Sequence, residues 1–578
     1  MANDPELIAE DMTEAEVAEE IEQLEEVYET DYEIGQDNTD WFGLDFHGVV
    51  FAVSAALIVL FVGLSLAFPQ GASSVLSDLR VGIGNHFDGL FLVAGNIFVL
   101  FCLSLIVLPV GSIRIGGEEA TPDFSRLSWF AMLFAAGMGI GLMFWSVAEP
   151  VGYFTEWAGT PLNVPGFTEA SEQAALGATM YHWGLHPWAI YAVVALALAF
   201  FSFNKGLPLT IRSTFYPLLG ERVWGPIGHV LDTLAVLATL FGLATSLGFG
   251  AKQAASGIAY LTPLAGGLGL QVLIIVAVTA LALISVMRGI NRGVRVLSNI
   301  NMGLALLLLV FVAFAGSVVA VLGHFATTVT GYVSYVLPLS NPFGREDTAF
   351  YHGWTIFFWA WWISWSPFVG SFIARVSRGR TVREFLITVL LVPTVLTSFW
   401  MATFGGTGIA KAASGIGALG DGISDSSLAL FQMLAEMPWS SVTSLIAIVL
   451  VLVFFVTSSD SGSLVIDSIT AGGKTNSPKF QRLFWVVTQG LIAAVLLTVG
   501  GAGALDALQA GAVSSGLPFV FVLLAMCVSL AMGLHHERQL LTMQAVQAVL
   551  ENGDEAETET PSLASMDHPL RDQERPLL

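Results

Sequence analysis

Residues 127–149 read LSWFAMLFAAGMGIGLMFWSVAE, and this stretch decides the fold that we predict. It is apolar over enough residues to cross a bilayer core of about 30 Å as a helix. Its centre holds Gly137, Gly139 and Gly141, and a glycine costs about 1 kcal/mol relative to alanine inside a helix. Backbone groups in hydrocarbon need partners, so an interruption is tolerated only where it faces protein, water or a ligand. Close helix packing of the small-xxx-small kind is the alternative reading.

The rest of the chain has the same apolar character. Of its 578 residues, 54% are hydrophobic and only 12% are charged, which predicts an all-α integral membrane protein. We predict twelve transmembrane helices, at 47–68, 87–109, 127–149, 177–203, 228–256, 269–287, 299–323, 350–374, 385–410, 441–469, 482–500 and 513–533. Segment 324–340 is too polar and short to cross, so we expect a short amphipathic helix at the outer interface.

The basic residues predict the orientation of these helices. Lysines and arginines fall in every second loop, whereas the intervening loop 150–176 has none. Basic loops stay in the cytoplasm, so both termini are predicted to be cytoplasmic. The first 40 residues carry sixteen Asp or Glu and no Lys or Arg, and supply much of the net charge of −24. We divide the chain into an acidic N-terminal tail at 1–45, a transporter domain at 46–535 and a C-terminal tail at 536–578.

A second interruption is predicted in the eighth span. There Pro367 removes a hydrogen-bond donor and clashes with the preceding turn. It lies five spans after the glycine stretch, and one discontinuous helix in each of two repeats is typical of transporters with a site at the bilayer midplane.

Two clusters of aromatic residues lie in the fourth and eighth predicted spans. Most of the fifteen tryptophans suit interfacial belts. Rings around a desolvated cavity, however, attract a cation by about 0.5–2 kcal/mol each and suit quaternary ammonium groups, which donate no hydrogen bonds. The candidate rings are Trp183, Trp188 and Tyr191 in the fourth span, and Trp362, Trp365 and Phe368 on one face of the eighth.

A polar run in the tenth span predicts an ion site. Thr457 and Ser458 would offer hydroxyl oxygens to a hard cation such as Na⁺, although such hydroxyls often bond back to the preceding turn. Asp460 follows them, and an ionisable residue in a span is either paired structurally or part of an ion or proton route.

Together these motifs resemble the betaine/carnitine/choline transporter family over roughly 45–535. The matching motifs are GMGIGLMFWSVAEP at 137–150, HWGLHPWAIY at 182–191, FFWAWWISWSPFVG at 357–370, ARVSRGRTVREF at 374–385 and FFVTSSDSGS at 454–463.

The resemblance implies a five-plus-five inverted-repeat symporter fold preceded by two extra helices, and a homotrimer. It also implies an aromatic box completed by the unwound glycine stretch, and a sodium site between the third and tenth spans. The implied substrate-binding residues are Trp183, Trp188, Tyr191, Trp362, Trp365, Gly137, Met138, Gly139 and Gly141, to which the helical spacing of the eighth span adds Phe368. The implied sodium ligands are Ala135, Met138, Phe454, Thr457 and Ser458.

Two departures from the family pattern narrow the implied function. Choline carriers tend to have an Asp where this chain has Gly141, and the absence of that acid favours a zwitterion. The family's second sodium site uses two threonines, but here Thr239 is followed four residues later by Leu243, so the sodium stoichiometry stays open.

We therefore predict a sodium-coupled carrier that takes up glycine betaine as an osmoprotectant across the cell's inner or plasma membrane by alternating access. Choline, carnitine, ectoine or dimethylsulfoniopropionate as substrate, and proton coupling, are the alternatives. No cofactor besides Na⁺ as the coupling ion and no nucleic-acid partner are expected. An enzyme is disfavoured because the spans lack clustered metal ligands, and an ion channel because no filter-like loop is present.

Overall fold

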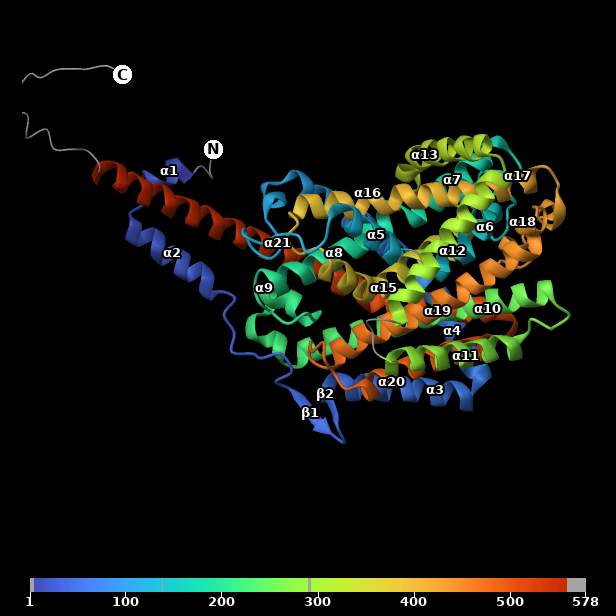
Figure 1. The fold of residues 1–578 in the computed structure, drawn as a ribbon, viewed down its shortest axis with the longest axis horizontal. Helices are drawn as coiled ribbons and strands as arrows, with labels where there is room; N and C mark the ends of the chain where they lie inside the picture. Colours follow the sequence, from blue (N-terminus) through green and yellow to red (C-terminus); the bar gives the residue numbers. More distant parts are fainter. Residues whose placement is uncertain (1–4, 138, 289–292, 559–578) are drawn as a thin grey trace, which may run out of the picture. The chain divides into compact units, whose positions relative to one another are not determined.

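The computed structural model describes residues 5–137, 139–288 and 293–558 (Figure 1). Within these ranges the secondary structure is helical apart from one hairpin. The chain forms two compact units, one within residues 1–31 and 533–578 and the other at 32–532.

The smaller unit combines segments from both tails. It contains α1 (Pro5–Ala9), α2 (Glu14–Glu26) and the end of α21 (Ala504–Thr558). A capping box starts α2, where the Thr13 hydroxyl accepts from the Glu16 N–H and the Glu16 carboxylate accepts from the Thr13 N–H. Tyr28 lies edge-on to His536 with ring centres 5.1 Å apart. The acidic segment is thus helical over Glu14–Glu26.

The larger unit begins with a two-stranded antiparallel hairpin and continues as helices. Strand β1 (Asn38–Trp41) pairs with β2 (Leu44–His47), with Asn38 opposite His47. The first helices are α3 (Gly48–Ala67), α4 (Pro69–Val107), α5 (Arg126–Gly137), α6 (Ile140–Phe154), α7 (Glu169–Trp183), α8 (Leu185–Phe203) and α9 (Tyr216–Leu219). They are followed by α10 (Pro226–Leu261), α11 (Leu268–Arg288), α12 (Gly293–Ala315), α13 (Val318–Ser340), α14 (Thr348–Phe350), α15 (Ile356–Arg375) and α16 (Val382–Met401). The last are α17 (Thr407–Ala413), α18 (Ala429–Ala435), α19 (Ser440–Thr470), α20 (Lys479–Gly500) and α21.

Among the described residues every predicted span lies mainly on helix, so the prediction of an all-α membrane protein is confirmed. Eleven helical stretches of the described residues are long and apolar enough to cross a membrane. They include α13, count α20 and α21 as one stretch, and omit the short helices α5 and α6. The count of twelve, with two extra leading helices, stays a prediction.

The boundary between the seventh span and the following segment was predicted wrongly. Helix α12 ends at Ala315, and α13 begins at Val318, so residues 318–323 belong to α13 rather than to the span. The chain turns at Ser317, whose φ of 87° no helix tolerates. The segment after the seventh span is therefore a 23-residue helix, longer than predicted.

The interruption predicted in the third span is present. Helix α5 ends at Gly137 and α6 begins at Ile140, with Gly139 in an extended conformation between them.

The interruption predicted in the eighth span is wrong. Helix α15 runs unbroken through Pro367. Proline leaves the carbonyl four residues earlier without its usual donor. The Ser366 hydroxyl supplies one, donating to the Ile363 carbonyl at 2.7 Å. The irregular turn of this span lies instead at its start, where Tyr351–Thr355 is a π-helix.

Candidate functional site

Five predicted aromatic residues surround one small cavity. Trp183, Trp188, Tyr191, Trp362 and Trp365 line a space of about 30 Å³, together with Pro187 and Thr397. All five rings are buried. The ring centres of Trp183 and Trp362 are 4.8 Å apart at an interplanar angle of 75°, and those of Tyr191 and Trp362 are 6.2 Å apart. We call these five rings the aromatic box. In this conformation its cavity has room for only one or two waters.

A break that the sequence reasoning missed positions the first rings of the box. The predicted fourth span is two helices, because α7 ends at Trp183 and α8 begins at Leu185. Gly184 lies between them, and a Cβ there would meet the Met180 carbonyl oxygen at 2.6 Å. Trp183 therefore ends one helix while Trp188 and Tyr191 lie in the first turns of the next. The sequence signal for this helix break is Gly184 followed by Pro187.

The box is backed by a buried carboxylate that we also did not predict as a site residue. Glu149 of α6 is fully buried and accepts from Trp183 Nε1 at 2.6 Å and from the Tyr153 hydroxyl at 3.0 Å. His182 Nδ1 lies 2.8 Å from the same carboxylate, and its Nε2 lies 3.0 Å from the Thr355 hydroxyl. These bonds fix the edge of Trp183. An acid within a predicted span was the sequence signal for this network.

The glycine stretch packs directly against the rings. A Cβ at Gly141 would lie 2.4 Å from Trp361 Cη2 and 3.3 Å from Trp183 Cη2, so only glycine lets the two elements approach this closely. A Cβ at Gly139 would touch the Trp365 ring at 4.0 Å. Gly137 is the last residue of α5, and Met138 lies outside the described residues.

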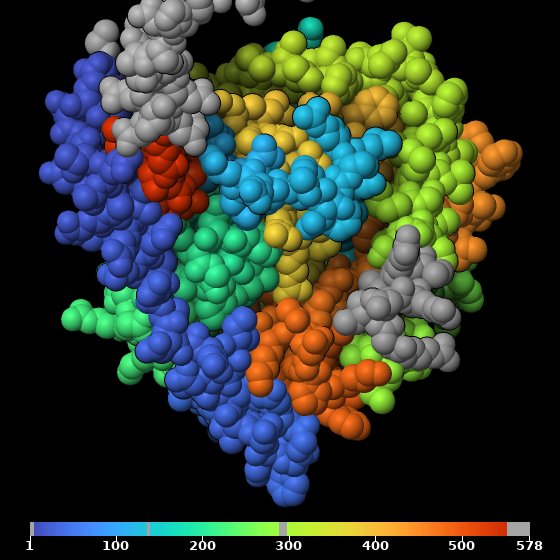
Figure 2. Space-filling model, turned by 60° about the vertical axis from the view of Figure 1, so that its left-hand side comes forward, coloured from blue at the N-terminus to red at the C-terminus, as the bar shows by residue number. Residues whose placement is uncertain are grey.

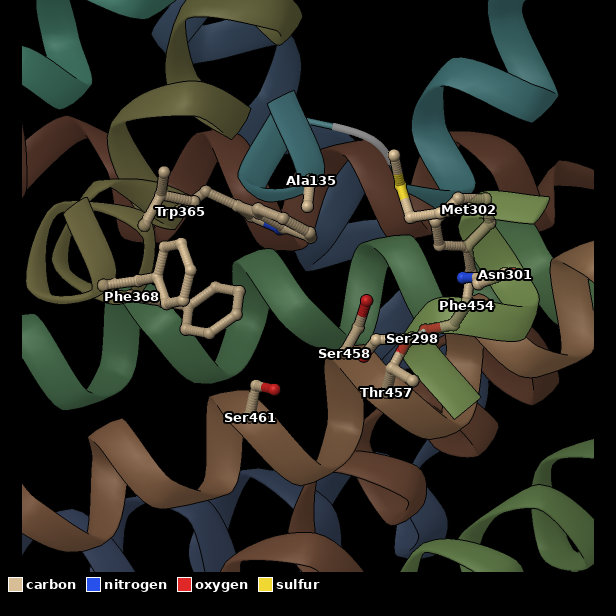
Figure 3. A pocket seen from close by; sticks show the side chains of 12 residues that line it. Ala135, Ser298, Asn301, Met302, Trp365, Phe368, Phe454, Thr457, Ser458 and Ser461 are labelled. Atoms are coloured by element: carbon tan, nitrogen blue, oxygen red, sulfur yellow. Dashed lines mark hydrogen bonds between the residues drawn. The ribbon is translucent and has the colours of Figure 1, made fainter. Parts of the chain in front are cut away.

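The predicted sodium ligands lie together around a second cavity of about 160 Å³ (Figure 3). Ala135 of α5 faces Phe454, Thr457 and Ser458 of α19 across it. Figure 3 shows the Ser458 hydroxyl pointing to the side where Ala135 and the Trp365 ring lie. Trp365 lines this cavity as well as the aromatic box. Phe368 lines only the second cavity of the two, so it lies beside the box rather than in it.

We call this 160 Å³ space the hydroxyl cavity. Its two hydroxyl groups, on Thr457 and Ser458, differ in their hydrogen-bond partners. Thr457 Oγ1 donates back to the Val453 and Phe454 carbonyls, both at 3.1 Å, which is the local bond that such residues often make. Its lone pairs stay available to a cation. Within the described part of the chain, the Ser458 hydroxyl has no hydrogen-bond partner. Helix α19 is continuous at Phe454, so any carbonyls freed by unwinding come from the end of α5.

The proposed second sodium ligand is not part of either cavity. Thr239 donates to the Ala235 carbonyl at 2.7 Å. Leu243, one turn later, is fully buried, and a Cβ at Gly462 of α19 would lie 2.3 Å from its Cδ1. Hydrocarbon thus packs where the family pattern has a second hydroxyl.

Asp460 has a structural partner. Its carboxylate pairs with Arg482 of α20 at 2.5 Å and accepts from the Ser285 hydroxyl at 2.9 Å. Removing either member would leave a buried charge alone, which is costly. Of the two roles open for Asp460, the contacts support structural pairing.

Comparisons with known proteins agree with this arrangement. The family model described as BCCT, betaine/carnitine/choline family transporter, matches residues 49–539. A glycine betaine transporter of Vibrio parahaemolyticus is 61% identical, over 88% of this chain and 98% of its own. A glycine betaine/proline/choline/ectoine transporter of the same species is 56% identical, over 88% and 91%. A glycine betaine transporter of Acinetobacter baylyi is 41% identical, over 86% and 74%.

These relatives are transporters, not enzymes, and the match covers nearly every helix that builds the two cavities. The chain belongs to the betaine/carnitine/choline transporter family.

Proposed function

We propose that the protein is a sodium-coupled symporter that brings a betaine-type zwitterion, with glycine betaine as the leading substrate, into the cell. The observation that carries the proposal is the aromatic box joined by Trp365 to the hydroxyl cavity. The box suits a trimethylammonium group through the negative faces of its rings. The hydroxyl cavity offers hard oxygen ligands to Na⁺.

The surroundings of Gly141 support a zwitterion over a free cation. An acidic side chain at this position would collide with Trp361, because a Cβ alone comes within 2.4 Å of that ring. Glu149 does not line the box, and its oxygens are engaged by Trp183 and Tyr153. A substrate that carries its own carboxylate compensates its ammonium charge without one from the protein. The names of the relatives also favour glycine betaine, with choline, proline and ectoine as alternatives.

A separate cavity of about 620 Å³ is lined by Trp145. Aromatic rings separate this cavity from the box, and this separation supports alternating access. Phe358 lies between the two, with its ring 5.9 Å from Trp145 and 5.7 Å from Trp183. By the distribution of basic loops this cavity faces outside. The outer approach is therefore closed by rings that pack edge to face, and these rings must separate to admit substrate.

Sodium would act by holding α5 and α19 together across the hydroxyl cavity, which fixes Trp365 among the other rings of the box. The sodium gradient then supplies the free energy for accumulation. We place the protein in the inner or plasma membrane as a homotrimer, with both termini in the cytoplasm and an osmoprotective role.

Uptake of a panel of labelled solutes into proteoliposomes tests the substrate. Glycine betaine, choline, carnitine, ectoine and dimethylsulfoniopropionate are compared with and without an inward sodium gradient. We expect saturable, sodium-stimulated uptake that is fastest for glycine betaine. Faster uptake of choline would refute the zwitterion preference, and unsaturable ion flux without solute uptake would indicate a channel.

A further inference from the structure

Two of the four arginines in the motif ARVSRGRTVREF have no side-chain partner among the residues that the structure describes. Arg380 donates to Glu384 at 3.0 Å and to the Phe124 carbonyl at 2.7 Å, and Arg383 donates to the Ile106 carbonyl at 2.7 Å. These two arginines tie neighbouring segments together. In contrast, Arg375 and Arg378 make no ion pair and no side-chain hydrogen bond within the described residues. The rule that basic residues stay in the cytoplasm accounts for their presence but not for this difference.

Both free arginines line a cavity of about 680 Å³. Lys474 lines it as well, and so does one carboxylate, Asp123. Lys474 is paired with Asp45 at 2.6 Å, and Asp123 is exposed and forms no ion pair with the arginines. Ser202 of α8 and Asn476 add neutral polar groups to the wall. Among the described residues that line it, the cavity therefore carries more positive than negative charge.

The segments that form this basic cavity can be followed on the surface in Figure 2. The orange segment after α19, the yellow end of α15 and the green end of α8 gather on the face shown. The space between the yellow and orange segments is hollowed.

The basic cavity is reached along the same helices as the substrate site. On α15, Trp365 lines the aromatic box and the hydroxyl cavity, Phe372 lines the hydroxyl cavity, and Arg375 lines the basic cavity. Ten residues of helix separate Trp365 from Arg375, which is about 15 Å. Helix α19 gives Ser461 to the hydroxyl cavity, and the segment directly after it gives Lys474 to the basic one.

We propose that Arg375 and Arg378 form a release site for the carboxylate of the transported zwitterion. The proposal rests on the proposed function above. The aromatic rings that hold the ammonium end offer the carboxylate few donors, whereas guanidinium groups bind carboxylates through two parallel, charge-assisted hydrogen bonds. A substrate that leaves the box along α15 passes the hydroxyl cavity and then meets these groups. The pair thus provides a weak intermediate binding position on the way to the cytoplasm.

The test measures release from one side of the membrane. The Arg375→Gln/Arg378→Gln double variant is compared with wild type and with Arg222→Gln, an exposed arginine that lines none of these cavities. Proteoliposomes are loaded with increasing labelled glycine betaine, and protein orientation is checked by protease access to the tails. The competitor is internal 3,3-dimethylbutanoate, the isostere of glycine betaine that keeps the carboxylate but has carbon in place of the ammonium nitrogen.

We expect the double variant to raise the half-saturation concentration on the internal side about tenfold, the effect of losing one charge-assisted contact. External half-saturation should change less than twofold. Internal 3,3-dimethylbutanoate should inhibit efflux by wild type and by Arg222→Gln but not by the double variant. Arg375→Lys/Arg378→Lys keeps the positive charge and should bring the internal half-saturation concentration part of the way back to the wild-type value. This variant separates loss of charge from misfolding.

An unchanged internal half-saturation in a folded double variant would overturn the proposal. So would an effect seen only in vesicles that contain anionic lipid, since the arginines would then bind a lipid phosphate. If wild type carries no glycine betaine at all, the proposed function fails instead. In that case, binding of 3,3-dimethylbutanoate to the purified protein tests the anion site by itself. Binding to wild type that is lost in the double variant would support the site, and no binding to wild type would refute it.

Discussion

Replacing Trp362 by leucine tests the aromatic box at its centre. This ring lies 4.8 Å from Trp183 and 6.2 Å from Tyr191, and its Nε1 donates to the His182 carbonyl at 2.9 Å. The side chain is only 6% exposed, so its contact with a bound ammonium would be fully desolvated. Trp362→Leu therefore removes one ring face and one hydrogen bond, while leaving an apolar side chain in place.

The expected loss follows from these contacts. One desolvated cation–π contact is worth about 2 kcal/mol, and each 1.4 kcal/mol is a factor of ten in affinity. The dissociation constant for glycine betaine should then rise about 30-fold. Trp362→Phe keeps an aromatic face and should cost only a fewfold change.

Calorimetric binding to the purified protein, followed by uptake in proteoliposomes, gives the two readouts. Trp400→Leu is the matched control, because Trp400 of α16 is also buried but stacks on Phe404 and does not line the box. We expect it to lower thermal stability without altering the dissociation constant. A Trp362→Leu protein that binds glycine betaine within twofold of wild type would refute the box.

Three further changes probe the rest of the site. Thr457→Ala with Ser458→Ala removes both hydroxyls from the hydroxyl cavity and should raise the sodium half-saturation about tenfold, since charged contacts of this kind are worth 1.5–3 kcal/mol; an unaltered sodium titration would reject that site. Glu149→Gln keeps the shape of the side chain but sets an amide N–H₂ against the donors of Tyr153 or His182, so substrate affinity should fall about tenfold. The same loss in Glu149→Asp, which keeps the charge, would show that side-chain length rather than charge accounts for the effect. Gly141→Ala places a methyl group 2.4 Å from the Trp361 ring and should abolish saturable uptake, which retained wild-type uptake would contradict.

The sequence predicted the helical, membrane-spanning character of the chain and the third-span interruption. Apolar windows report burial in lipid directly, and alternate glycines weaken a helix whatever surrounds them. The interruption expected at Pro367 was wrong because the Ser366 hydroxyl replaces the missing donor. Such a local compensation depends on a side-chain rotamer, which composition does not reveal.

The site was predicted in part. The rings and hydroxyls named from their motifs do line two adjoining cavities, and Gly141 packs against Trp361 and Trp183. The Glu149 network was missed because Glu149 bonds to His182 and Trp183, which follow it by 33 and 34 positions in the chain. No local sequence pattern predicts that pairing. The partner of Asp460 was not predicted either, since Arg482 lies on the following helix.

The most direct test of the account is solute accumulation driven by sodium. Purified protein in proteoliposomes receives trace labelled glycine betaine with an inward sodium gradient, an inward proton gradient or neither. The account predicts accumulation above the external concentration with the sodium gradient alone, and its collapse when an ionophore dissipates that gradient. Accumulation driven equally well by protons, or mere equilibration that ignores sodium, would contradict it.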